Sequence, residues 1–294
     1  MTKFKTKKNY SKAINQVAQY VDQNYEQKLT LASMAMVANI SEFHFSRIMQ
    51  TCTGETPSKF LKRHRLYQAY KQLKSDSQAD ILNIALNVGY ENHASFSRAF
   101  RKYFGMSPKD VSQKKHALIK PFIMSTSSDH KIIVTPDIVH LGGFTCYGSE
   151  VSGYADRSYV EAAGPVFKKL ISLLFENNIS LIGKRIGGIP LDNVREIEHD
   201  QCCFAAVIKS VDDLSHLNLH TYTFESGAWA IFNHIGPYST LWQTWNRAYL
   251  NWIIGLGVPL RDAPAFEIYE HSPDTAEDER LTQIYIPIAT INED

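Results

Sequence analysis

Apolar residues recur at helical spacing throughout the first part of the chain. Between residues 14 and 25 they lie three or four positions apart with polar residues between them, which predicts an amphipathic helix. Thr30 and Ser41 are typical N-cap residues, and each precedes another short helical pattern. The further helices that we expect span about 60–73, 80–88, 92–103 and a short segment from 107.

The helical part contains an internal repeat. When the chain is shifted by 51 positions, seven identities fall within 27 aligned positions without a gap. The matched pairs are Leu31 with Leu82, Val37 with Val88, Phe45-Ser46-Arg47 with Phe96-Ser97-Arg98, Gly54 with Gly105, and Pro57 with Pro108. Each copy is predicted to be a short helix, a tight turn and a second helix, the arrangement of a helix-turn-helix unit. Gly89 lies where the second turn needs a permissive backbone.

Beyond Lys120 the pattern changes to short segments rich in β-branched and aromatic residues. The strands that we expect span about 131–135, 138–147, 203–209, 228–235, 266–271 and 281–288, with helices at about 158–177 and 239–254. A strand, a Gly-Pro pair with a helix, and two further strands occur twice in succession. We therefore expect an α+β domain of two pseudo-symmetric β-α-β-β units, with both helices packed across one sheet.

The expected organisation is multidomain. An all-α domain with two helix-turn-helix units occupies residues 1–116, a linker occupies 117–130, and the α+β domain occupies 131–294. The Ser/Thr-rich residues 125–128 are typical of a flexible linker. We therefore expect the two domains to be tethered flexibly, without an extensive contact between them.

The charge divides at the same place. Residues 1–116 carry 19 Lys and Arg against 8 Asp and Glu, whereas residues 117–294 carry 12 against 22, although the net charge of the whole chain is only +1. Such an excess in one half favours a polyanionic partner, and nucleic acid is the common one because phosphate contacts release counterions. A solvated basic surface without a partner is the alternative.

Composition excludes several classes of protein. The chain has 294 residues, of which 44% are apolar and 21% charged, as is typical of folded domains. The four cysteines are too scattered for a disulfide framework, and neither cysteines nor histidines have the spacing of a metal site. The sequence has no signal-peptide h-region and no apolar run long enough to span a membrane. We expect a cytoplasmic protein without membrane segment, metal or cofactor.

The second helix of each unit has a polar face opposite its apolar face. In the first copy this face carries Phe43, Ser46, Arg47 and Gln50, and in the second it carries His93, Ala94, Ser97 and Arg98. Short polar side chains beside arginine suit a helix in the major groove, because arginine can bond both acceptors of guanine. The alternative is an ordinary solvated helix face, but two copies in phase within a basic segment favour DNA.

These helices resemble a known family. The segment NISEFHFSRIMQTCTGETPSKFLKRHRLYQAYKQL and the following ILNIALNVGYENHASFSRAFRKYFGMSPKDV are similar to the DNA-binding domain of AraC/XylS transcription regulators, over about residues 10–113. The resemblance implies that the second helix of each unit enters one of two adjacent major grooves of double-stranded DNA. It also implies RNA polymerase as a partner, while activation, which we expect, and repression both stay open. The target sequence does not carry over, because Phe43 and Ser46 stand where some members have Trp and Gln.

The acidic half has an aromatic stripe, which by itself predicts residues packed against the sheet. Its GPY, FEIY and YIPI motifs resemble GyrI-like ligand-binding domains, over about residues 130–294. The resemblance implies that Glu267, in the FEIY strand, meets lipophilic organic cations in an aromatic cleft; a solvent-facing strand carboxylate is the alternative. A carboxylate among aromatic rings lacks compensation until a cation arrives, and ring faces attract the same cation. The candidate wall residues are Tyr147, Trp242, Trp245, Tyr249 and Tyr269.

We therefore expect a DNA-binding transcription regulator that senses a small molecule, and not an enzyme. Two alternatives for the second domain remain open at this point. One is a hydrolase of small electrophilic compounds that uses the glutamate and its aromatic cleft. The other is a protein-interaction module without a small ligand.

Overall fold

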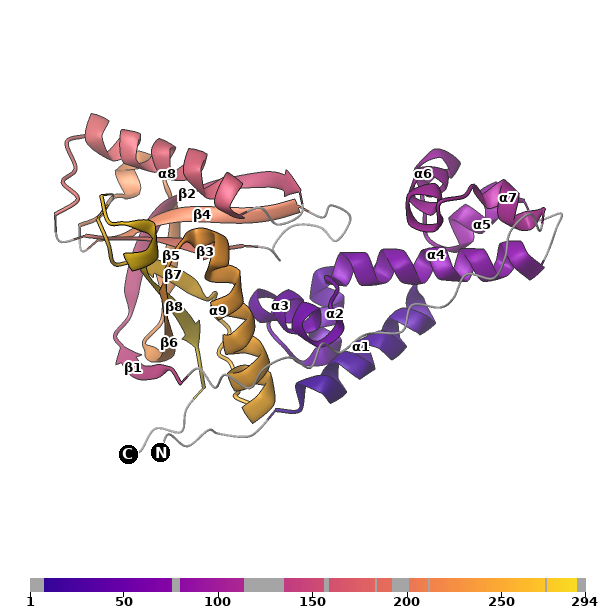
Figure 1. Ribbon diagram of the computed structural model, residues 1–294, viewed down its shortest axis with the longest axis horizontal. Coiled ribbons are helices and arrows are strands. Elements are labelled where there is room, and N and C mark those ends of the chain that lie inside the picture. The colour runs from indigo at the N-terminus through magenta and orange to yellow at the C-terminus, as the bar shows by residue number, and fades with distance from the viewer. Residues whose placement is uncertain are drawn as a thin grey trace.

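A helical part and a part built on a β-sheet lie beside each other (Figure 1). The computed structural model describes residues 8–75, 80–113, 135–155, 159–182, 184–191, 201–210, 212–272 and 274–289. The expected linker over 117–130 and the expected strand at 131–135, apart from Thr135, lie outside the described residues.

The helical part follows the predicted pattern. Its helices are α1 (Tyr10–Asn24), α2 (Leu31–Ala38), α3 (Glu42–Thr53), α4 (Pro57–Ser75), α5 (Ile81–Asn87), α6 (His93–Phe104) and α7 (Pro108–Ser112). Helices α2 and α3 form the first helix-turn-helix unit, α5 and α6 form the second, and α4 joins them (Figure 1). The predicted helical domain with two such units is therefore confirmed.

Local capping explains why the two units begin and end in phase. Thr30 begins α2 with a capping box, and the Asn92 side chain accepts a backbone N–H at the start of α6. Gly54 and Gly105 end α3 and α6 in the left-handed conformation, with φ of 76° and 72°. Gly89 has φ of 82° in the second turn, as its predicted permissive role requires.

The described strands form one antiparallel sheet in the order β1-β6-β8-β7-β3-β4-β2-β5. They are β1 (Asp137–Leu141), β2 (Phe144–Ala155), β3 (Arg185–Pro190), β4 (Gln201–Lys209), β5 (His220–Phe224), β6 (Gly227–Ile235), β7 (Phe266–Tyr269) and β8 (Leu281–Pro287). On one side of the sheet centre the strands lie in the order β7, β8, β6, and on the other side in the order β3, β4, β2. Since β6 precedes β7 and β8 in the chain just as β2 precedes β3 and β4, the two halves have the same connectivity. The α+β architecture is confirmed, while the symmetry of the two units in space stays a prediction.

Four strands differ from the sequence prediction. The expected strand at 138–147 is two strands, β1 and β2, separated at Gly142-Gly143, and neither β3 nor β5 was predicted. Strand β3 contains two adjacent glycines, which by sequence are typical of a turn. Gly187 is nevertheless required inside the sheet, because a Cβ there would lie 2.0 Å from the backbone oxygen of Glu267.

Helices cover the sheet as predicted. Helix α8 (Tyr159–Glu176) packs against β2 and β4, and α9 (Leu241–Arg247) packs against β6. Helix α9 continues directly into the π-helical segment η3 (Ala248–Ile254), whose wider turn is a feature often found at functional sites. Short 3₁₀ turns occur at η1 (Ser215–Leu217), η2 (Tyr238–Thr240) and η4 (Glu277–Glu279).

The first helical unit shares its apolar core with the sheet domain. Buried side chains of α1–α4 form one cluster with those of β6, β8, α9 and η3, including Ile14, Phe45, Phe232, Trp245 and Ile284. The Tyr10 hydroxyl also donates a hydrogen bond to the carbonyl oxygen of Val258 at 2.7 Å. The second unit has a separate core beneath α4–α7. The expected flexible tethering is therefore wrong for the first unit, because apolar residues of α1–α4 serve both the helical core and a contact between domains.

Candidate functional site

Glu267 lies at the centre of the sheet with both carboxylate oxygens hydrogen-bonded. It stands on β7 opposite Gly188 of β3, and only 5% of it is exposed. Trp245 Nε1 donates to Oε1 at 2.7 Å, and the Tyr269 hydroxyl donates to Oε2 at 2.8 Å. Tyr269 reaches the carboxylate from the same strand, because residues two apart share a face. The alternative of a solvent-facing carboxylate is therefore wrong.

The electrostatics of this carboxylate are unbalanced. Burial raises the pKa of Glu267, while the hydrogen bonds from Trp245 and Tyr269 and the charge of Arg47 act to lower it. Burial and the nearby Glu267 charge raise the pKa of Tyr269 well above its ordinary value, so its hydroxyl is a neutral donor. Since the hydrogen bonds do not offset the desolvation, the carboxylate would be stabilised by additional positive charge.

Glycine opposite the carboxylate makes room for aromatic rings. A Cβ at Gly188 would lie 2.2 Å from the Phe204 ring and 3.0 Å from the Tyr269 hydroxyl. The rings of Tyr238 and Phe167 pack edge-on against Tyr269, with centroids 5.4 Å and 5.5 Å away. These four residues, Gly188, Phe204, Tyr238 and Phe167, were not predicted from the sequence to belong to the site. The available signal was the GPY motif, which contains Tyr238.

A cationic side chain from α3 lies on the same aromatic residues. Cζ of Arg47 is 3.9 Å from the ring centroid of Trp245 and 5.5 Å from that of Tyr249. A guanidinium over an aromatic face is attracted by the ring quadrupole. Trp245 thus contacts the guanidinium with its face and Glu267 with its Nε1. We call Arg47, Trp245, Tyr269 and Glu267 the carboxylate cluster.

The other predicted wall residues lie in different surroundings. Tyr147 belongs to the apolar cluster beneath α8, and its hydroxyl donates to Asp213 Oδ1 at 3.2 Å. Trp242 is 59% exposed. Tyr249 is buried beside Arg47. The structure therefore brings Trp245 and Tyr269 to Glu267, places Tyr249 next to them, and places Tyr147 in another part of the core.

His44 connects α3 to the sheet domain through both ring nitrogens. Nδ1 lies 2.9 Å from the Tyr249 hydroxyl, and Nε2 lies 3.2 Å from the carbonyl oxygen of Arg261. Because a carbonyl can only accept, Nε2 carries the proton and Nδ1 accepts from Tyr249. Burial, aided by the charge of Arg47, lowers the pKa of His44 to about 4. A neutral imidazole therefore fits this contact at pH 7.

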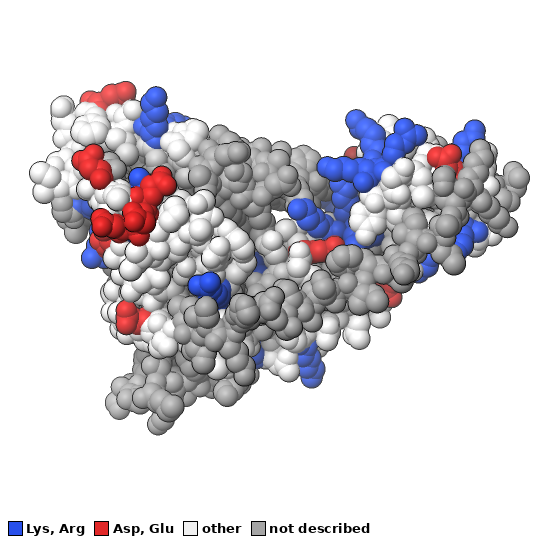
Figure 2. Space-filling view, in the orientation of Figure 1, with Lys and Arg blue, Asp and Glu red and all other residues white. Residues whose placement is uncertain are grey.

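The two helices predicted to contact DNA differ in exposure. We call the eight predicted DNA-contacting residues the groove faces: Phe43, Ser46, Arg47 and Gln50 on α3, and His93, Ala94, Ser97 and Arg98 on α6. On α6, three of the four are exposed and the fourth is half-buried. Figure 2 shows Lys and Arg gathered on the end of the molecule that carries α6 in Figure 1. On α3, Phe43 is exposed, Arg47 and Gln50 are half-buried and Ser46 is only 3% exposed, and Arg47 lies on Trp245 of the sheet domain.

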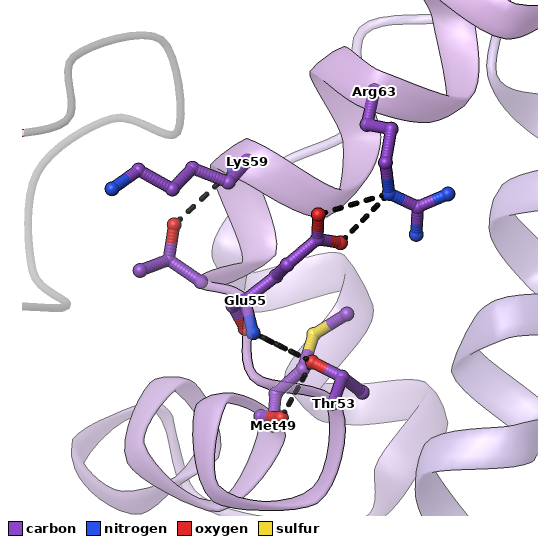
Figure 3. A network of polar contacts seen from close by, with 6 residues as sticks. Met49, Thr53, Glu55, Lys59 and Arg63 are labelled. Atoms are coloured by element: carbon purple, nitrogen blue, oxygen red, sulfur yellow. Dashed lines mark hydrogen bonds and ion pairs between the residues drawn. The ribbon is translucent and has the colours of Figure 1, made fainter. Parts of the chain in front are cut away.

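Helix α3 is held firmly to α4 by a polar network at their turn (Figure 3). Both carboxylate oxygens of Glu55 lie 2.9 Å from Nε of Arg63, which lies nearly two turns into α4. The Thr53 hydroxyl donates to the carbonyl oxygen of Met49 at 2.8 Å and accepts from the backbone N–H of Glu55 at 3.1 Å. Side chains on both sides of the turn are thus fixed, and α3 would move with α4 and not separately.

Among the described residues there is neither a metal-binding group nor a membrane-spanning helix. No group of three or more His, Cys, Asp or Glu side chains among them is placed to hold a metal ion. Within the same part of the chain, no helix is both long and apolar enough to cross a bilayer. The carboxylate cluster itself combines one buried carboxyl group, two neutral hydrogen-bond donors, the guanidinium of Arg47 and the surrounding rings.

Curated relatives match the helical part of the chain. The probable transcriptional regulator LumQ of Photobacterium leiognathi is 34% identical over 89 residues, which are 30% of this chain and 36% of LumQ. The regulatory protein SoxS of Escherichia coli K12 is 28% identical over 106 residues, which are 36% of this chain and 98% of SoxS. This chain thus matches about a third of the length of LumQ and nearly all of SoxS.

A solved structure and two protein families complete the comparison. The structure of SAV2435 bound to tetraphenylphosphonium is 16% identical, with a TM-score of 0.39, and covers 52% of this chain and 93% of that one. The family described as a helix-turn-helix domain matches residues 34–114. The family described as a GyrI-like small molecule binding domain matches residues 135–289. The chain therefore belongs to the GyrI-like small-molecule-binding family, and its N-terminal helices form an AraC-type helix-turn-helix domain.

Proposed function

We propose that this protein is a cytoplasmic transcription regulator that binds double-stranded DNA through its helix-turn-helix units and a lipophilic organic cation through its GyrI-like domain. The DNA part is supported by the groove face of α6, where the exposed Arg98 lies among small polar side chains. Exposed Arg101 and Lys102 on the same helix add positive charge for phosphates. Activation through RNA polymerase completes the proposal by family resemblance.

The observation that carries the ligand part is the burial of Glu267 among aromatic rings. The residue is 5% exposed, and its carboxylate accepts hydrogen bonds from the two neutral donors Trp245 and Tyr269. A cation supplies charge compensation that neutral donors cannot, and aromatic faces attract it further. The position of Arg47 on Trp245 supports the same conclusion, because a positive group is already stable there.

The same geometry supports binding in preference to catalysis. A carboxylate that acts as general base must reach the proton of a water molecule or substrate. In Glu267 one oxygen accepts from Trp245 and the other from Tyr269, so hydrogen bonds to the protein engage both. We therefore propose that Glu267 provides a counter-charge and performs no hydrolysis.

A fluorescence titration of the full chain tests the ligand proposal, because Trp245 reports directly on the site. Tetraphenylphosphonium serves as the cationic probe and triphenylphosphine oxide as a neutral one. Removing one partner of a buried charge pair costs about 2–5 kcal/mol, so Glu267→Gln should weaken the cation by roughly 30-fold to several thousand-fold. The neutral probe should bind the variant and the parent about equally.

The matched control is Glu279→Gln, which removes a carboxylate from an exposed position of the same domain. It should bind tetraphenylphosphonium as tightly as the parent. Equal binding by the parent and by Glu267→Gln would place the carboxylate outside the ligand site and refute the proposal. Urea midpoints of both variants verify that each remains folded.

A further inference from the structure

The internal repeat supplies a comparison within one molecule. Under the shift of 51 positions, Ser46 and Arg47 of α3 correspond to Ser97 and Arg98 of α6. Arg98 is exposed, whereas Arg47 is half-buried on the ring of Trp245. Ser46 is 3% exposed, whereas Ser97 is half-buried. The same pair of residues thus differs in exposure between the two units, and in the first unit its arginine lies on the sheet domain.

Arg47 supplies the positive charge at the carboxylate cluster that a cationic ligand would supply. Its guanidinium lies 3.9 Å from the centroid of Trp245, the residue whose Nε1 bonds Glu267. A flat, delocalised cation suits an aromatic face, and its charge favours the ionised carboxylate. A ligand cation stacked on the same face of Trp245 would need the volume that Arg47 occupies.

We propose that Arg47 is an internal competitor of the cationic ligand, so that the ligand and the docked α3 exclude each other. In the closed state Arg47 lies on Trp245 and is withheld from DNA. In the open state the ligand occupies the carboxylate cluster and α3 is released for DNA. This inference rests on the proposed function, because it assigns a regulatory consequence to the proposed ligand site.

The contact around Arg47 makes release a joint movement. His44 bonds Tyr249 and the Arg261 carbonyl, and Tyr10 bonds the Val258 carbonyl, all across the boundary between the domains. Because Glu55 and Arg63 fix α3 to α4, displacing Arg47 would move the first unit together. A ligand that binds only the open state raises the population of that state by its differential affinity. By linkage, the ligand and DNA then favour each other's binding.

The experiment changes a residue of the helical domain and measures ligand binding by the sheet domain. Arg47→Gln removes the internal competitor, so the full chain should bind tetraphenylphosphonium about 2- to 25-fold more tightly, the range of one cation–π contact. Arg98→Gln is the matched control, because it removes the same charge at the corresponding position of α6 and should leave the affinity unchanged. Triphenylphosphine oxide should also bind Arg47→Gln more tightly, since the competition is for space on Trp245.

The possible results separate this inference from the proposed function. Equal cation affinity in the parent and in Arg47→Gln would overturn the competition and leave the ligand site intact. Tightening of the cation alone, without the neutral probe, would indicate simple charge repulsion and also overturn it. If neither protein binds tetraphenylphosphonium, the proposed ligand class fails, and the inference fails with it.

Hydrogen exchange gives a second, independent measurement. Saturating tetraphenylphosphonium should increase amide exchange across α3 in the parent chain, because its packing against the sheet domain is lost. The amides of α6, whose unit has its own core, should be unaffected. Ligand binding with unchanged protection of α3 would show that the ligand and α3 occupy the sheet domain at the same time, and would overturn the inference.

Discussion

Acid should detach the first helical unit from the sheet domain, through His44. Its pKa falls from an ordinary 6.5 to about 4 in the closed state, chiefly because of burial. A histidine with a lowered pKa stabilises the closed state fully above pH 6.5, and this contribution is lost as the pH falls toward 4. The full difference corresponds to about 3 kcal/mol, of which about 2 kcal/mol is lost by pH 5.

Other groups near His44 contribute to the same transition and must be separated from it. The charge of Arg47 disfavours a positive charge on His44, while Tyr249 and the Arg261 carbonyl hold the neutral ring. Burial also raises the pKa of Glu267, so its protonation is a second contribution to be separated. Comparing the parent with His44→Gln isolates the histidine, since Gln cannot gain a charge and keeps a polar side chain.

Hydrogen exchange of α3 amides between pH 7.5 and 5, corrected for intrinsic exchange rates, measures the opening equilibrium. The parent should open roughly 30-fold more at pH 5 than at pH 7.5, in line with about 2 kcal/mol. His44→Gln should show a much smaller dependence on pH. An equal dependence in both proteins, or unchanged protection of α3 in the parent, would refute the assignment of this transition to His44.

Three further predictions concern single residues. Because burial raises the pKa of Glu267, the native state binds protons more tightly than the unfolded state. The free energy of unfolding should therefore fall as the pH rises above 4.5, and urea unfolding of Glu267→Gln should show less of this decline. Gly188→Ala should destabilise the chain by about 1–3 kcal/mol, because its Cβ would lie 2.2 Å from the Phe204 ring; an unchanged urea midpoint would contradict this. Arg98→Ala should cost about 1–3 kcal/mol on a selected operator and much less on a scrambled duplex, and equal losses would indicate a phosphate contact.

Local sequence signals were sufficient for the helical part. Helix ends depend on neighbouring residues, so Thr30, Gly54 and Gly105 could be recognised from the chain alone. Strand β3 could not, because Gly187 and Gly188 satisfy a requirement that exists only once β7 and β4 lie on either side. A glycine pair in a turn and one in a crowded central strand look the same in a sequence.

The site was predicted in part. Glu267 was proposed from a family motif, and its bonds to Trp245 and Tyr269 follow the expected association of a carboxylate with aromatic rings. The position of Arg47 could not be predicted, because its spacing on α3 equally suits a DNA contact. The position of His44 could not be predicted either. Its contacts with the sheet domain depend on how the two domains dock, which periodicity does not show.

The separate core of the second helix-turn-helix unit allows the two units to be in different states at the same time. While the first unit is docked on the sheet domain, α6 remains exposed at the far end of α4 (Figure 1). Because Glu55 and Arg63 fix α3 to α4, a chain held to DNA through α6 would carry α3 at a fixed distance from the neighbouring groove once the sheet domain leaves it. The ligand would then change how many grooves one chain holds, and hence its residence time on DNA, more than its rate of arrival.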